Sequence, residues 1–96
     1  MTNEEMIELF DRIKDEELLK FNKPVLSKHK RCDLNAMLIL DELCPGTGDI
    51  IAYAGHDEIA FDTDINELAR VITTEQIREL VRCGVFYQDD SLYMYV

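Results

Sequence analysis

The sequence predicts a single small α+β domain with an N-terminal amphipathic helix and a C-terminal β-hairpin. At 96 residues, the chain has room for one hydrophobic core. Hydrophobic residues make up 47% and charged residues 31%, which is an ordinary balance for a globular domain. Apolar residues follow helical spacing in some segments and alternate in others. We therefore expect one domain over residues 1–96, with an N-terminal helix at 1–19, a basic connector at 20–31 and a core at 32–96.

The first element is a helix that begins near Asn3. Thr2 and Glu5 form the pattern T-x-x-E, in which each side chain accepts a hydrogen bond from the other residue's backbone N–H. Apolar residues then recur at helical spacing and leave an acidic outer face; they are Met6, Leu9, Phe10 and Ile13. Pro24 disfavours a helix in the connector, which we expect to be an extended arm.

A second helix is expected from Asp33, a good N-cap residue, to about Leu43. It is apolar almost all round, which predicts the centre of the core. Leu38 and Leu40 should therefore both be buried. The sequence Cys44-Pro45-Gly46 ends this helix.

Two strands are expected next, at residues 50–54 and 58–62, around the turn Gly55-His56-Asp57. The second strand alternates well, with Ile59 and Phe61 on one side. The first is less regular and could be a loop.

Two short helices follow the strands. Asp64 with Glu67 begins one of them, and Thr73 with Gln76 forms a capping box for the other. Gly84 ends the second helix. The residues expected to face inward are Ile65, Leu68, Ala69, Ile72, Ile77, Leu80 and Val81.

The chain closes with a hairpin that turns at Asp89-Asp90 or within 88–91 and pairs Tyr87 with Leu92 and Val85 with Met94. Period two places Val85, Tyr87, Leu92, Met94 and Val96 on one face, and Phe86, Tyr93 and Tyr95 on the other. This aromatic stripe has two interpretations. Either the first helix covers it, or it is a surface for a partner or for a homodimer.

Charge is spread unevenly over a chain with a net charge of −10. Residues 1–19 carry −5, 20–31 carry +5, 32–63 carry −7 and 64–96 carry −3. The basic connector could contact phosphates or an acidic partner. Alternatively, it neutralises the acidic outer face of the first helix.

The order of helix, strand, two helices and hairpin, with the stretch INELARVITTEQIRELVRCGV, resembles the winged-helix superfamily over residues 32–96. The resemblance implies that the second of the paired helices lies in the DNA major groove and that the hairpin is the wing. Candidate nucleic-acid contacts are then Arg78, Arg82, Lys28, Lys30 and Arg31. The charges disfavour this function, because Glu75 and Glu79 balance the helix arginines and Asp89-Asp90 would repel phosphates.

Other chemistries have little support. Cys32, Cys44 and Cys83 are odd in number and form no CxxC, which indicates reduced thiols. Metal-ligand residue types are scattered, so no metal or cofactor is expected. His56-Asp57-Glu58 lie side by side in a turn, so we expect no catalysis. Gly46-Thr47-Gly48 lacks the Lys-Ser/Thr of a phosphate loop. No apolar run is long enough to span a membrane, and a cytoplasmic location is expected.

These observations lead to a non-catalytic acidic module that binds a protein partner with a basic surface. The expected contact residues are Asp89, Asp90, Phe86, Tyr93 and Tyr95. One form of the hypothesis is a DNA-mimicking inhibitor or regulator of a nucleic-acid-processing machine. A viral protein of this kind is one example. The alternative is a dimeric winged-helix transcription regulator, which would need the helix arginines and the connector on one face.

Overall fold

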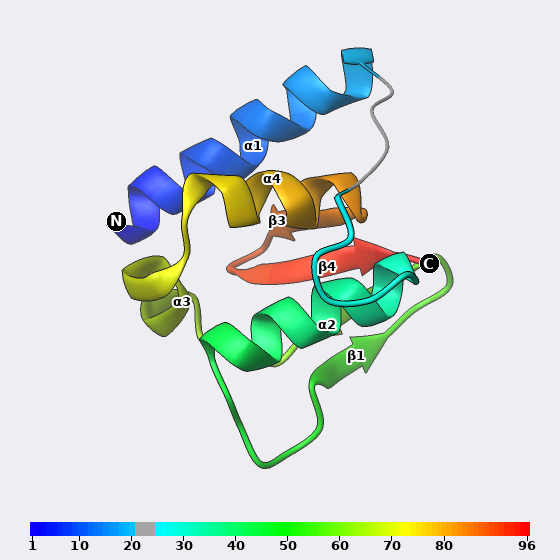
Figure 1. Ribbon diagram of the computed structural model, residues 1–96. Coiled ribbons are helices and arrows are strands. Elements are labelled where there is room, and N and C mark those ends of the chain that lie inside the picture. The colour runs from blue at the N-terminus through cyan, green and yellow to red at the C-terminus, as the bar shows by residue number, and fades with distance from the viewer. Residues whose placement is uncertain (21–24) are drawn as a thin grey trace.

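The computed structural model describes residues 1–20 and 25–96, with only the backbone at 18–20. These residues form four helices and a four-stranded sheet (Figure 1). The elements in order are α1 (Asn3–Lys20), α2 (Cys32–Leu43), β1 (Ile51–Ala54), β2 (Glu58–Phe61), α3 (Ile65–Val71), α4 (Thr74–Arg82), β3 (Val85–Gln88) and β4 (Ser91–Tyr95). The predicted α+β class is confirmed. The predicted connector at residues 21–24 lies outside the described residues.

Side-chain caps mark the starts of α1, α3 and α4. Glu5 N–H donates to Thr2 Oγ1 (3.1 Å) and Thr2 N–H donates to Glu5 Oε1 (3.3 Å), which is the predicted capping box. Asp64 caps α3 by accepting from two backbone N–H groups, and Thr73 with Gln76 forms a second capping box on α4. After α4, Gly84 has a φ of +97°, a left-handed conformation that favours glycine.

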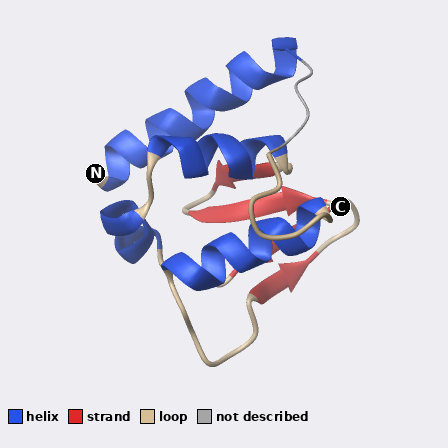
Figure 2. Cartoon of the chain, in the orientation of Figure 1, coloured by secondary structure: helices blue, strands red, loops and turns tan. Residues whose placement is uncertain are grey.

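The sheet is antiparallel with the strand order β1-β2-β4-β3. Figure 2 shows its strands in red and the helices in blue. The predicted pairs Val85–Met94 and Tyr87–Leu92 are confirmed. Asp89 and Asp90 form the turn with φ angles of 48° and 62°. Two successive left-handed residues are typical of a type I′ turn, whose twist matches that of a hairpin.

The hydrophobic core lies between the helices and one face of the sheet. From the sheet it contains Ile59, Phe61, Val85, Leu92 and Met94. From the helices it contains Met6, Phe10, Ile13, Ala36, Ile39, Leu40, Leu68, Ala69, Ile77 and Leu80, and it also contains Ile72 and Cys83, which directly follow α3 and α4. Helix α1 packs on α4, α3 and β3. At its start, the amino group of Met1 donates to the Ala69 carbonyl (2.9 Å), and Asn3 donates to Asn66.

The prediction that α2 is buried all round is wrong. Leu38 is 44% exposed and Leu34 is 40% exposed, whereas Leu40 is 1% exposed. In Figure 1, α2 lies at one edge of the helical layer, so part of its surface faces away from the other elements. Asp33 is also not the N-cap, because the helix begins one residue earlier, after Arg31.

The alternation of the hairpin stops before the last residue. Val96 was expected on the core face, but it is 66% exposed and follows the end of β4. Its backbone N–H donates to the carbonyl of Asp57 (2.9 Å), so the chain end leaves the core and runs beside the β1–β2 turn.

Candidate functional site

Two of the predicted nucleic-acid contacts, Arg78 and Arg82 of α4, are bonded to a carboxylate of α1. Arg82 Nε donates to Glu17 Oε2 (2.9 Å) and its Nη2 donates to Oε1 (3.2 Å). Arg78 Nη1 donates to the same Oε1 (3.2 Å) and lies 3.6 Å from Glu16. The hydrogen bond from Arg82, followed by that from Arg78, lowers the pKa of Glu17, although burial opposes the shift.

This arrangement changes what α4 can offer. The Glu17 side chain is only 7% exposed and the two arginines are 18–26% exposed, so the cluster is partly withdrawn from water. Two of the basic charges that a DNA-reading helix would use are therefore satisfied within the chain. Sequence reasoning missed Glu17, because no local pattern indicates a contact across 61 and 65 residues.

The described part of the connector lies on α2 and α4. Lys28 Nζ is 2.5 Å from Glu42 Oε2, and the Ser27 hydroxyl donates to Glu79 (2.7 Å). The alternative that the connector neutralises α1 finds no support among residues 25–31, whose ion pair goes to α2 instead. Lys30 and Arg31 are exposed.

A buried asparagine holds this part of the connector. Asn35 is fully buried; its Oδ1 accepts from the backbone N–H groups of Lys28 (2.8 Å) and His29 (3.0 Å), and its Nδ2 donates to Glu79 (2.7 Å). Burial alone would raise the pKa of Glu79, but the hydrogen bonds from Asn35 and Ser27 outweigh it and lower the pKa. Asn35 was the sequence signal for these contacts, because it is a polar residue inside an apolar helix and a buried polar group needs hydrogen-bond partners.

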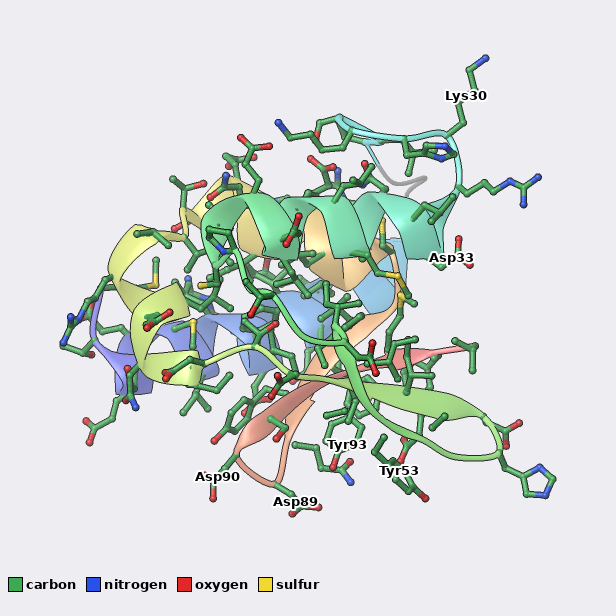
Figure 3. The ribbon with its side chains drawn as sticks, turned by 90° about the horizontal axis from the view of Figure 1, so that it is seen from below. Lys30, Asp33, Tyr53, Asp89, Asp90 and Tyr93 are labelled. Atoms are coloured by element: carbon green, nitrogen blue, oxygen red, sulfur yellow. The ribbon has the colours of Figure 1, made fainter. Side chains whose placement is uncertain are left out.

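The sheet face that points away from the core carries a row of side chains across all four strands. Cross-strand pairing joins Tyr53 to Ala60, Ala60 to Tyr93 and Tyr93 to Phe86. Paired residues of adjacent strands share a face. In Figure 3, Tyr53 and Tyr93 project together on the side of the sheet away from α2. We name Tyr53, Ala60, Tyr93, Phe86 and Tyr95 the aromatic face.

Exposure differs along this face. Tyr53 is 59% and Tyr95 is 55% exposed, Tyr93 is half-buried, and Phe86 is only 4% exposed. Phe86 stacks between the two β4 tyrosines, with ring centroids 5.6 Å from Tyr93 and 4.3 Å from Tyr95. Phe86 is nearly buried and the two tyrosines stack on it, so its predicted contact with a partner stays a prediction.

Neither interpretation of the aromatic stripe is complete. Of the α1 residues expected as its cover, Met6, Phe10 and Ile13 belong to the core cluster and Leu9 packs against that cluster. The α1 residue that lies over the stripe is Lys14, whose Nζ is 4.9 Å from the Phe86 ring centroid and 5.8 Å from that of Tyr95.

Tyr53 joins the aromatic face because β1 contains a bulge. Ile51 pairs with Phe61 on the core side, and the register then shifts so that Tyr53 pairs with Ala60. Regular pairing would have placed Tyr53 opposite Ile59, toward the core. A Cβ at Gly55 would come within 3.2 Å of the Tyr53 ring, so this glycine lets the ring lie against the turn. The sequence gives no signal for Tyr53 on this face, because a bulge breaks the period of two.

The two acids of the hairpin tip have different neighbours. Asp90 accepts a hydrogen bond from the Tyr87 hydroxyl (3.1 Å), and Asp89 accepts one from Gln88 (3.4 Å). Both are exposed. In Figure 3 they lie at the end of the sheet far from Lys30, so the tip and the basic connector are on different sides of the molecule.

An open hollow of about 250 Å³ lies beside Gly46-Thr47-Gly48. The carboxylates of Asp41, Asp49 and Asp62 line it, and they would repel a phosphate. Within residues 1–20 and 25–96, no group of three or more His, Cys, Asp or Glu side chains is placed to hold a metal ion.

Cys83 is buried beside Asn35, whose Nδ2 donates a hydrogen bond to the Cys83 sulfur (3.6 Å). Burial, more than any neighbour, raises the pKa of Cys83 to about 11. A thiol with so high a pKa is un-ionised at neutral pH and is a poor nucleophile. All three cysteines are free thiols in this structure.

Comparisons with protein-family models, curated proteins and solved structures gave no match. The winged-helix assignment therefore stays a prediction.

Proposed function

We propose that this chain is a non-catalytic protein-binding module whose acidic surface binds a protein with a basic surface. The observation that carries the proposal is the Glu17 cluster. Arg78 and Arg82 are bonded to α1, so the helix that the winged-helix resemblance would place in DNA offers largely neutralised side chains. Duplex DNA binding depends on basic groups that neutralise phosphates.

The charge of the whole chain supports the same function. A net charge of −10 attracts basic proteins and accelerates their encounter at low salt. The exposed acids Asp89 and Asp90 at the hairpin tip contribute to that field. A basic surface that normally binds nucleic acid is one such partner, so a DNA-mimicking inhibitor is one form of this proposal.

No helix among the described residues is long and apolar enough to cross a membrane.

The test measures association rates with a partner isolated by affinity capture, over a range of salt concentrations. Asp89→Asn with Asp90→Asn removes two charges, and asparagine tolerates the left-handed φ angles of this turn. The matched control is Asp33→Asn with Asp41→Asn, which removes two charges from exposed positions on α2. We expect the association rate to fall as the salt concentration rises. Relative to the parent, the tip variant should lose several-fold more of its association rate than the control loses.

Two results would count against the proposal. An association rate independent of salt would show that the acidic surface does not steer binding. Equal rates for the parent, the tip variant and the control would remove Asp89 and Asp90 from the contact.

A further inference from the structure

We propose that the aromatic face of the sheet is the docking site for a lysine- and arginine-rich segment of the partner, whose cationic side chains lie over Tyr53 and Tyr93. The inference rests on the proposed function, because it names the surface and the chemistry of the same protein contact. Its basis is an exposed aromatic surface that the chain itself already uses to hold a cation.

Lys14 shows that this surface accepts a cation. Its ammonium group lies 4.9 Å from the Phe86 ring centroid and 5.8 Å from that of Tyr95, within the ~6 Å range of a cation–π contact. Tyr53 and Tyr93 continue the same row toward β1. Among the described side chains, no cation lies over either of these two rings.

The acids around the face match a cationic segment. Glu58 pairs with Tyr95 across β2 and β4, so its side chain is on the aromatic face. Asp57 is exposed in the turn beside it. At the other end, Asp89 accepts a hydrogen bond from Gln88, whose register in β3 is also that of the aromatic face. A guanidinium stacked on a tyrosine could therefore pair with a carboxylate at either end.

The same acids disfavour the other occupants of an aromatic sheet face. Nucleic-acid bases also stack on aromatic rings, but their phosphates would meet Glu58 and Asp89. A second copy of the chain would bring together two molecules that each carry a charge of −10, with the acids around their aromatic faces close enough to repel one another. A basic segment meets neither penalty.

The probe is an oligo-arginine peptide, titrated into the full chain at about 0.15 M salt and followed by calorimetry and NMR. Tyrosine emission gives an additional signal, since the chain contains no tryptophan. We expect the NMR shifts to concentrate on β1, β2 and β4. Tyr53→Leu should weaken the affinity about twofold to fivefold, whereas Tyr53→Phe, which keeps the ring, should stay within about twofold of the parent.

Tyr53 is 59% exposed, so its replacement should leave the fold intact. Glu58→Gln with Asp89→Asn should weaken binding more than the charge-matched control Asp33→Asn with Asp41→Asn. If the two double variants weaken binding equally and Tyr53→Leu binds like the parent, the docking site is overturned while the proposed function stands.

Other results are equally decisive. If oligo-arginine does not bind, the docking site is overturned, and the salt dependence of the captured partner judges the proposed function separately. If the unliganded chain dimerises and Tyr53→Leu abolishes the dimer, the aromatic face belongs to a second copy. Tighter binding of single-stranded nucleic acid than of oligo-arginine would assign the face to that ligand instead.

Discussion

Leu38 and Leu40 lie two positions apart in α2, but only Leu40 is buried. Leu40 is 1% exposed in the core and Leu38 is 44% exposed. Leu40→Ala should lower the free energy of unfolding by about 2–5 kcal/mol, because it leaves a cavity. Leu38→Ala should lower it by less than about 1 kcal/mol, because it removes a side chain that already meets water. Urea denaturation of the two variants measures both values, and equal losses would contradict the placement of α2.

The sequence could not separate these two leucines. An amphipathic helix shows its buried side by the spacing of its polar residues, but α2 has apolar residues on every side from Leu34 to Leu40. Asn35 adds to the ambiguity, since it is polar and fully buried. Only the packing of α2 at the edge of the helical layer decides which side meets water.

Cys83 should be the slowest of the three thiols to react with iodoacetamide. Its pKa is raised to about 11, mainly by burial, and the reactive species is the thiolate. Cys32 and Cys44 are only half-buried. Mass spectrometry of the alkylated peptides should show modification of Cys83 that follows global unfolding and is faster in Leu40→Ala. Modification of Cys83 as fast as that of Cys32 in the folded chain would show that this site opens locally.

At the scale of the elements, α1 is held on the domain by two groups of contacts. The Asn3–Asn66 bond lies near its start, and Glu17 with the two α4 arginines lies near its end. Glu17→Gln should lower the midpoint of thermal unfolding, because two partly buried guanidinium groups lose their carboxylate. Glu16→Gln is the matched control. Glu16 is 42% exposed and lies 3.6 Å from Arg78, so its loss should cost less.

The same carboxylate should make stability depend on pH. A lowered pKa in the folded state means that Glu17 contributes fully above its ordinary value of 4.5 and loses that contribution as pH falls below it. Glu79, whose pKa is also lowered, changes in the same direction. The difference in melting midpoint between the parent and Glu17→Gln should therefore shrink as pH falls below 4.5. A constant difference down to the lowest pH would contradict the role of the Glu17 charge.

Short-range patterns in the sequence predicted the helices and strands well, but they did not predict contacts between residues far apart in the chain. The capping boxes at Thr2 and Thr73 and the hairpin register were correct, because each depends on residues a few positions apart. The bulge that turns Tyr53 outward depends on the pairing of β1 with β2. For this reason the aromatic stripe of the hairpin was found, but its continuation on β1 was not.

For the whole molecule, folding places the acids of the hairpin tip away from Lys30 of the basic connector. The Cα radius of gyration is 12.2 Å, which is close to the ~13 Å expected of a compact domain of this length. Within this small body, Lys30 and the hairpin-tip acids lie on different sides (Figure 3). The totals of each segment could be counted from the sequence, but their separation in space required the fold. A basic face that joins the connector to α4 would also have to include arginines already bonded to Glu17.

This charge arrangement predicts weak binding to duplex DNA. At about 0.15 M salt, non-specific contacts of a DNA-binding protein give dissociation constants of ~10⁻⁴–10⁻⁶ M, and we expect this chain to bind no more tightly than the weak end of that range. Fluorescence anisotropy with a labelled duplex measures it. Asp89→Lys with Asp90→Lys should strengthen binding and make its salt dependence steeper, since log K changes by about −0.9 per neutralised phosphate for each unit of log salt. A submicromolar, sequence-dependent affinity of the parent would favour the DNA-binding regulator instead, because it would require the α4 arginines to exchange Glu17 for phosphate.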